Sequence, residues 1–161
     1  MPKPVPVKPT APLPLRDSPP PRVVLAFDFG KRRIGVACGD TVTRSASPLE
    51  AVTAEHDGLR WELVDKLLRE WQPDLAVVGL PYNVDGSDSD MTSAARGFAA
   101  ELKRRFLLEV ALVDERYSSL EAQARLKSAR ESGRRRRRVT PEAVDAEAAC
   151  VILERWFTEK T

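Results

Sequence analysis

The chain has 161 residues, with 26 Lys and Arg against 24 Asp and Glu and a net charge of +2. No run approaches the roughly 18 apolar residues of a membrane span, and the N-terminus lacks the apolar core of a secretory signal, so we expect no membrane partner. The two cysteines, Cys38 and Cys150, lie in separate apolar segments. This pattern favours buried free thiols in a reducing compartment and predicts a cytoplasmic protein.

Residues 1–22 contain nine of the 13 prolines and show no helical or strand period. Because proline lacks a backbone donor, this stretch is typical of a disordered or extended tail. Residues 23–161 then form one domain, long enough for a real hydrophobic core.

Three strands are predicted first in the domain. Val23–Phe29 is a continuous apolar run, Gly30–Arg33 forms a turn, and Ile34–Cys38 reads as the next strand. Ala46–Val52 is a third strand, which Pro48 places near an edge. These strands are expected to form an antiparallel meander.

Helices and strands alternate after the meander. A helix over Leu59–Trp71 precedes a buried strand over Leu75–Leu80, and a second helix over Ala94–Phe106 precedes a strand over Val110–Val113. A third helix begins at Ser118 or Ser119 and runs to about Glu131, and Thr140 caps a last one that begins at Pro141. The order predicts an α/β fold, with a five-stranded mixed sheet of three meander strands and two parallel strands flanked by helices.

The scarcity of histidine and cysteine limits the kinds of active site that the chain can form. The chain has one histidine, His56, and no Cys-x-x-Cys pair. A His/Cys zinc site and a Ser-His-Asp triad are therefore disfavoured. Carboxylates would have to hold any metal, which favours Mg²⁺ or Mn²⁺.

Four acids stand where water should be scarce. Asp28 ends a buried apolar run, and a turn aspartate capping the bend at Gly30 is an equally good interpretation. Asp114 and Glu115 end a strand, so they point to opposite faces, and they could be an ordinary strand-end pair. Asp145 shares the apolar face of the last helix, although the helix dipole alone would favour an acid there.

These acids would converge if the last helix packs across the strands that carry the others. Clustered carboxylates repel one another and need divalent cations, which can activate water and stabilise the leaving oxygen in phosphoryl displacement. The pattern therefore predicts a metal-dependent phosphodiester hydrolase.

Residues 125–138 carry eight cations against one acid, a net of +7, which leaves −5 for the rest of the chain. The run Arg134, Arg135, Arg136, Arg137 and Arg138 suits the backbone of a nucleic acid, which it would bind without reading sequence. A solvated loop is a compatible interpretation, and a localisation signal a weaker one.

Four segments resemble, in order, the motifs of the YqgF/RuvX family. They are Leu25–Ala37, Val77–Gly86, Asp114–Ser119 (Asp-Glu-Arg-Tyr-Ser-Ser) and Val144–Ala149. Together they span nearly all of residues 23–157, whereas the proline-rich tail lies outside the resemblance.

The resemblance implies an RNase H-like fold, a bacterial cytoplasmic nuclease and dependence on Mg²⁺ or Mn²⁺. It implies precursor 16S rRNA or branched DNA, including Holliday junctions, as substrate. Family acids map onto Asp28, Glu115 and Asp145 as catalytic and metal-binding residues, with Asp114 in reserve for the second position. Asn83 and Arg116 match polar positions that would contact phosphate or orient ligands, and Lys31, Arg32 and Arg33 are further expected nucleic-acid contacts.

The chain departs from the family pattern at Lys31, where a small residue is usual, and at Tyr117, where Leu is usual. Lys31 would add a phosphate contact, which affects substrate preference rather than activity. A homodimer would suit junction cleavage, because two symmetric strands require two sites. The alternatives are a non-catalytic module for ribosome assembly and a sugar kinase or actin-like ATPase, which would need two such domains around its nucleotide.

Overall fold

A computed structural model of the chain describes residues 22–55, 58–116, 118–133 and 140–159. The strands are β1 (Val23–Phe29), β2 (Arg33–Asp40), β3 (Ala46–Glu55), β4 (Gly58–Leu59), β5 (Leu75–Leu80) and β6 (Glu109–Asp114). The helices are α1 (Trp61–Trp71), α2 (Asp90–Phe106), α3 (Ser118–Glu131) and α4 (Pro141–Glu159).

The sheet has the order β4-β3-β2-β1-β5-β6. The meander β1-β2-β3 is antiparallel, and β5 and β6 run parallel to β1. The predicted topology is therefore confirmed, with one correction to the count. A sixth strand, β4, pairs Gly58 and Leu59 with the end of β3. Two residues carry too little periodicity to predict a strand. The helical spacing that includes Leu59 predicts too early a start for the following helix, which begins at Trp61.

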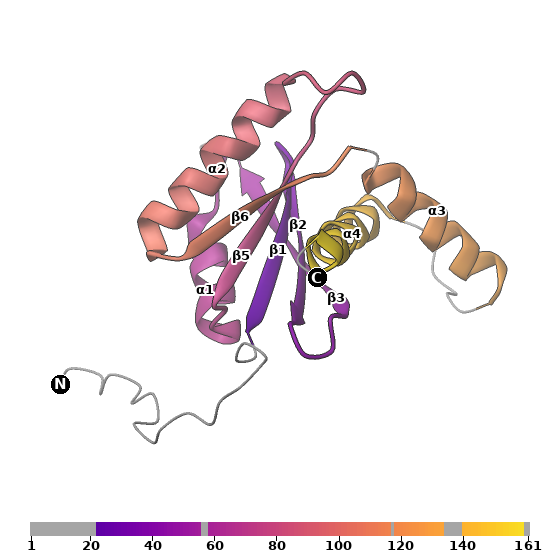
Figure 1. Cartoon of the computed structure of the whole chain (residues 1–161), viewed down its shortest axis with the longest axis horizontal. Helices are drawn as coiled ribbons and strands as arrows, with labels where there is room; N and C mark the ends of the chain where they lie inside the picture. Colours follow the sequence, from indigo (N-terminus) through magenta and orange to yellow (C-terminus); the bar gives the residue numbers. More distant parts are fainter. Residues whose placement is uncertain (1–21, 56–57, 117, 134–139, 160–161) are drawn as a thin grey trace.

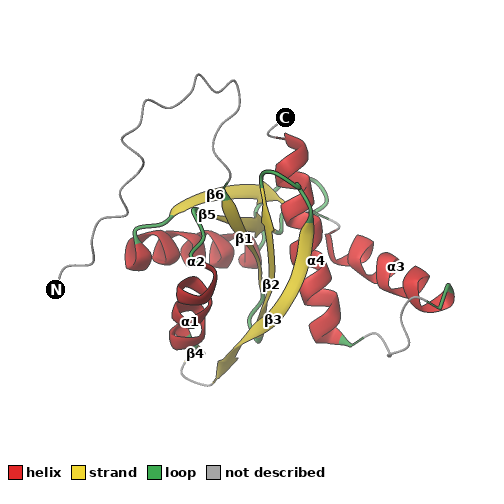
Figure 2. Ribbon diagram, turned by 90° about the horizontal axis from the view of Figure 1, so that it is seen from below, coloured by secondary structure: helices red, strands yellow, loops and turns green. Residues whose placement is uncertain are grey.

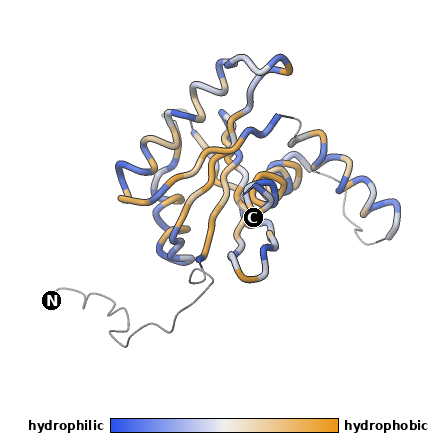
Figure 3. The backbone as a smooth tube through the Cα atoms, in the orientation of Figure 1, coloured by the Kyte–Doolittle hydropathy of each residue, from blue (hydrophilic) through white to orange (hydrophobic). Residues whose placement is uncertain are grey.

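The two faces of the sheet are covered differently (Figures 1 and 2). Helices α1 and α2 pack on one face, where residues such as Phe27, Val78 and Phe98 form one apolar cluster. Helix α4 crosses the other face, where Ala26, Val77 and Ile152 belong to a second cluster. The central strands are hydrophobic along most of their length (Figure 3). Alternation along β1 therefore places Asp28 on the α4 face.

Helix α3 packs on α4 and lies at the periphery of the described structure (Figure 2). Its Arg125 forms ion pairs with Glu147 and Glu154 of α4 at 3.5 and 2.7 Å. The predicted caps of α4 are present, since the Thr140 hydroxyl accepts the backbone N–H of Ala143 and Pro141 opens the helix. None of the described helices has the length and apolar character that a membrane crossing requires.

Candidate functional site

A buried and a half-buried carboxyl group, those of Glu115 and Asp28, meet where the parallel strands end. Asp28 is the penultimate residue of β1, and Glu115 directly follows β6, where its backbone N–H donates to the carbonyl of Leu80 at 3.1 Å. Glu115 is only 6% exposed. The carboxyl groups are hydrogen-bonded to each other, with Glu115 as the donor to Asp28. Crevices outside the carboxyl ends of such strands commonly bind ligands.

Burial raises the pKa of both acids. The pKa of Asp28 rises first through loss of water and then through the nearby charge of Asp145. Burial likewise raises the pKa of Glu115, and repulsion from Asp28 raises it further. The two groups share a proton because neither burial nor proximity tolerates two negative charges. A bound cation would likewise offset the repulsion between the two carboxylates.

Asp145 approaches this pair from the first turns of α4. Its effect on the pKa of Asp28 places it within electrostatic reach. Its carboxylate, about a quarter exposed, accepts a hydrogen bond from Nε of Arg33 at 2.6 Å. The three acids thus lie on the α4 side of the sheet, and Arg33 binds Asp145.

Two glycines make room for this arrangement. Gly35 pairs with Asp28 across β1 and β2, and a Cβ atom there would collide with the backbone carbonyl of Asp145. A Cβ atom on Gly79 would lie 2.5 Å from Ile152 and 2.9 Å from the side chain of Glu115. The absence of a side chain at Gly35 lets α4 lie close to β2. The absence of one at Gly79 lets α4 and Glu115 lie close to β5.

The structure separates the two acids that the sequence left as alternatives. Asp114 accepts hydrogen bonds from Nε and Nη2 of Arg116 at 2.9 and 2.7 Å. Partial burial opposes ionisation of Asp114, but the bonds from Arg116 outweigh it and lower its pKa. Glu115, not Asp114, contacts Asp28.

The predicted nucleic-acid contacts lie in different settings. Lys31 and Arg32 are exposed in the β1–β2 turn, close to the end of β1. The side-chain amide of Asn83 forms hydrogen bonds within its own loop, where it donates to the hydroxyl of Ser87 and to the backbone carbonyl of Asp88. Arg116 is bound to Asp114 and also donates to the carbonyl of Val84 at 3.3 Å.

The predicted cations Arg134, Arg135, Arg136, Arg137 and Arg138 lie outside the described residues, as do His56 and Tyr117. Their expected roles therefore remain sequence-based predictions.

Sequence reasoning missed Arg155. This α4 side chain donates to the carbonyl of Asp114 at 2.6 Å and fixes the end of β6, and its charge works to lower the pKa of Glu115. The sequence gives no signal for it, because Arg155 follows Glu154 in an ordinary charged stretch of the helix.

The acids suit the hard divalent cation that the resemblance implies. Among the described residues, no three His, Cys, Asp or Glu side chains already form a cluster suited to a metal ion, and Asp145 is engaged by Arg33. The Asp28–Glu115 pair nevertheless resists full ionisation, and a bound cation would offset the repulsion between its two carboxylates. Oxygen ligands of this kind fit Mg²⁺ or Mn²⁺.

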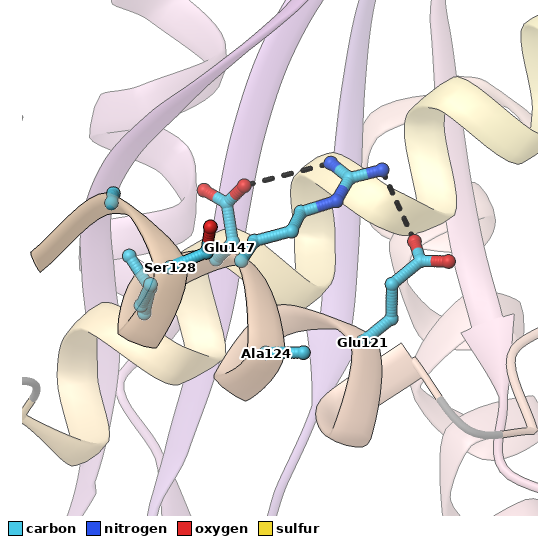
Figure 4. Close-up of a pocket in the computed structure, with 7 residues that line it drawn as sticks. Glu121, Ala124, Ser128 and Glu147 are labelled. Atoms are coloured by element: carbon cyan, nitrogen blue, oxygen red, sulfur yellow. Dashed lines mark ion pairs between the residues drawn. The ribbon is translucent and has the colours of Figure 1, made fainter. Parts of the chain in front are cut away.

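The cavity shown in Figure 4 lies elsewhere, along the contact between α3 and α4. Its charged groups neutralise one another, since Arg125 bridges Glu121 at 3.1 Å and Glu147 at 3.5 Å. Its lining does not include Asp28, Asp114, Glu115 or Asp145. This cavity is therefore not the candidate site.

Residues 22–159 match a family described as "RuvX: Holliday junction resolvase". A protein of Edwardsiella ictaluri named "Putative pre-16S rRNA nuclease" is 49% identical over 137 residues, which cover 85% of this chain and 95% of that protein. A protein of the same name from Yersinia enterocolitica is 48% identical over 139 residues, which cover 86% of this chain and 96% of the relative.

Two solved structures share the fold at low sequence identity. Thermus thermophilus RuvC in complex with a Holliday junction substrate has a TM-score of 0.50 and 16% identity, covering 86% of this chain and 94% of its own. The fowlpox virus resolvase bound to Holliday junction DNA has a TM-score of 0.55 and 11% identity, and the match covers 86% of this chain and 97% of the resolvase. The RNase H-like fold expected from the sequence motifs is thereby confirmed.

Proposed function

The chain belongs to the RuvX family, described as Holliday junction resolvases, and we propose from this that it is a nuclease that hydrolyses phosphodiester bonds in nucleic acid. The observation that carries the proposal is the pairing of half-buried Asp28 with buried Glu115, with Asp145 beside them. Nothing in the packing of a sheet requires two acids to share a proton in its interior, and their burial costs free energy that a ligand can offset.

Asp28, Glu115 and Asp145 would hold one or two divalent cations, Mg²⁺ or Mn²⁺. Such cations supply activation of water and neutralisation of the charge that develops on the phosphate. The chain's own groups do the rest. Loss of the shared proton would turn Asp28 and Glu115 into two carboxylate ligands, and Asp145 would become a third if it left its bond with Arg33. Arg155 fixes the strand end that carries Glu115. Lys31 and Arg32 bind the flanking phosphates.

Similarity to the curated relatives supports the precursor of 16S rRNA as the substrate of this chain. Proteins that bear this activity in their names are nearly half identical to the chain over almost their whole length. The junction-bound resolvases share the fold alone. The family description nevertheless names Holliday junctions, so a four-way DNA junction is the second substrate to test. The protein would act in the cytoplasm, and a homodimer would be required only for paired cuts in a junction.

The direct test is cleavage by the purified full chain. A labelled 16S precursor fragment and a synthetic four-way junction are each incubated with Mn²⁺ or Mg²⁺. We expect the wild-type chain to cut the precursor, and Asp28→Asn and Glu115→Gln each to lower the rate by at least about 100-fold, because each removes a charged ligand. Asp114→Asn should retain most of the rate, since Asp114 is held by Arg116 away from the pair.

The outcomes separate the alternatives. An Asp28→Asn protein that cuts as fast as wild type would refute the site. Cutting of the junction but not of the precursor would make branched DNA the substrate. Binding of both without cutting of either would identify a non-catalytic module.

A further inference from the structure

A second groove flanks the contact between α3 and α4. It has a volume of about 620 Å³. Its lining includes Gln123 and Lys127 of α3, Thr140 and Val144 at the start of α4, Asp145, and Arg33 of β2. We call it the Lys127 groove. Its volume falls in the range of small-ligand sites and is large enough for a nucleotide.

The charges of this groove differ from those of the cavity in Figure 4. There, Arg125 is surrounded by glutamates that neutralise it. In the Lys127 groove, Asp145 is paired with Arg33 at 2.6 Å, and Glu142 lies 4.0 Å from the same guanidinium. Lys127 is exposed and makes no ion pair or side-chain hydrogen bond with any residue that the structure describes. Its ammonium group is therefore available to an anion from outside.

Asp145 connects the groove to the acid site. It lines the groove, and it also lies within electrostatic reach of Asp28. A nucleic-acid strand whose reacting phosphate lies at the acids can therefore place a neighbouring nucleotide in the groove. The exposed amide of Gln123, one helical turn before Lys127, lies on the same side of α3 and can donate to the same backbone.

We propose that the Lys127 groove binds the sugar-phosphate backbone of the substrate strand next to the cleaved bond, with Lys127 as its phosphate contact. The inference rests on the proposed nuclease function and adds a subsite to it. A lysine point charge contacts phosphate without reading the base, so the subsite positions the strand whatever its sequence.

The test compares Lys127→Gln with Lys103→Gln. Lys103 is a matched control because it is also an exposed helical lysine, but it belongs to α2 on the opposite face of the sheet. Binding of a fluorescein-labelled 16S precursor fragment is measured by anisotropy in EDTA, so that the RNA stays intact, across roughly 50–200 mM salt. Unchanged melting temperatures confirm that both variants fold.

We expect Lys127→Gln to weaken binding about 3- to 10-fold and to reduce the slope of log Kd against log salt by roughly one, as the loss of one phosphate contact requires. Lys127→Arg should restore both values, and Lys103→Gln should match wild type. A Lys127→Gln protein with wild-type affinity and slope would overturn the subsite. A wild-type chain that cleaves the RNA in the presence of metal would at the same time uphold the proposed function, so the two failures are distinguishable.

Discussion

The shared proton between Asp28 and Glu115 makes the stability of the metal-free protein depend on pH. The folded-state pKa of each acid lies above its ordinary value, about 4, and reaches about 7 for Asp28. The folded chain therefore binds more protons than the unfolded chain between these values. The contribution of these two groups to the free energy of unfolding is therefore greatest below pH 4 to 5. It falls as the pH rises toward 7 and beyond.

Asp28→Asn should remove much of this loss. In EDTA at pH 8, we expect the variant to be more stable than wild type by roughly 1–3 kcal/mol, because a neutral amide replaces a carboxylate that burial disfavours. Urea unfolding at pH 5 and pH 8 measures the difference. Glu50→Gln, which alters an exposed carboxyl group on β3, should follow wild type at both pH values. Equal pH dependence of Asp28→Asn and wild type would show that the pair shares no proton.

How much of the site was predictable also depends on individual residues. Asp28 and Asp145 stand out because each interrupts an apolar pattern. Alternation established that Asp114 and Glu115 face opposite ways, but it could not show which face lies toward α4. That choice follows from a contact between separate segments, in which the side chain of Glu115 lies against Gly79 of β5, whereas Asp114 is held by its near neighbour Arg116. The pairing of Arg33 with Asp145, 112 positions apart, likewise has no local signal.

At the scale of elements, the site depends on how closely α4 lies against β2. The hydrophobic pattern predicts that α4 packs on the sheet, but it does not give the distance. Gly35 allows the closest approach to Asp145, because a Cβ atom there would collide with the backbone of that residue. The meander and the parallel strands were predictable because each has at least four periodic residues. Strand β4 was missed because it has two. Local patterns thus predict elements well and distances between them poorly.

Gly35→Ala should therefore destabilise the protein by roughly 1–3 kcal/mol, because the added methyl group must displace α4 or bend β2. Gly97→Ala is the matched control. Gly97 lies on the exposed face of α2 with nothing within 4 Å of an added Cβ, so alanine there should stabilise the helix by about 0.5–1 kcal/mol. Chemical unfolding measures both. The prediction fails if the two substitutions change stability in the same direction.

On the scale of the whole molecule, the two faces of the sheet have different roles, one structural and the other chemical. The face covered by α1 and α2 is a closed apolar core with aromatic contacts such as Phe27 to Phe98 at 5.5 Å. The α4 face contains the acids, Arg33 and Arg155, and it continues into the Lys127 groove. Substitutions on the first face should act through stability, and those on the second mainly through binding and cleavage.

The expected boundary between the proline-rich tail and the domain gives a last prediction. The family match starts at residue 22. Arg22 donates its backbone N–H to the hydroxyl of Thr41 at 2.9 Å, and its guanidinium pairs with Glu109 at 2.9 Å. Removal of residues 1–21 should therefore leave the melting temperature and the cleavage rate unchanged. Arg22→Ala in the shortened chain should lower stability by about 0.5–1.5 kcal/mol, because it removes a side-chain link between the residue before β1 and the first residue of β6. Thermal unfolding and the precursor cleavage assay measure both effects. If removing residues 1–21 alone slows cleavage while the melting temperature holds, that segment contributes to substrate binding, and the functional unit is larger than the folded domain.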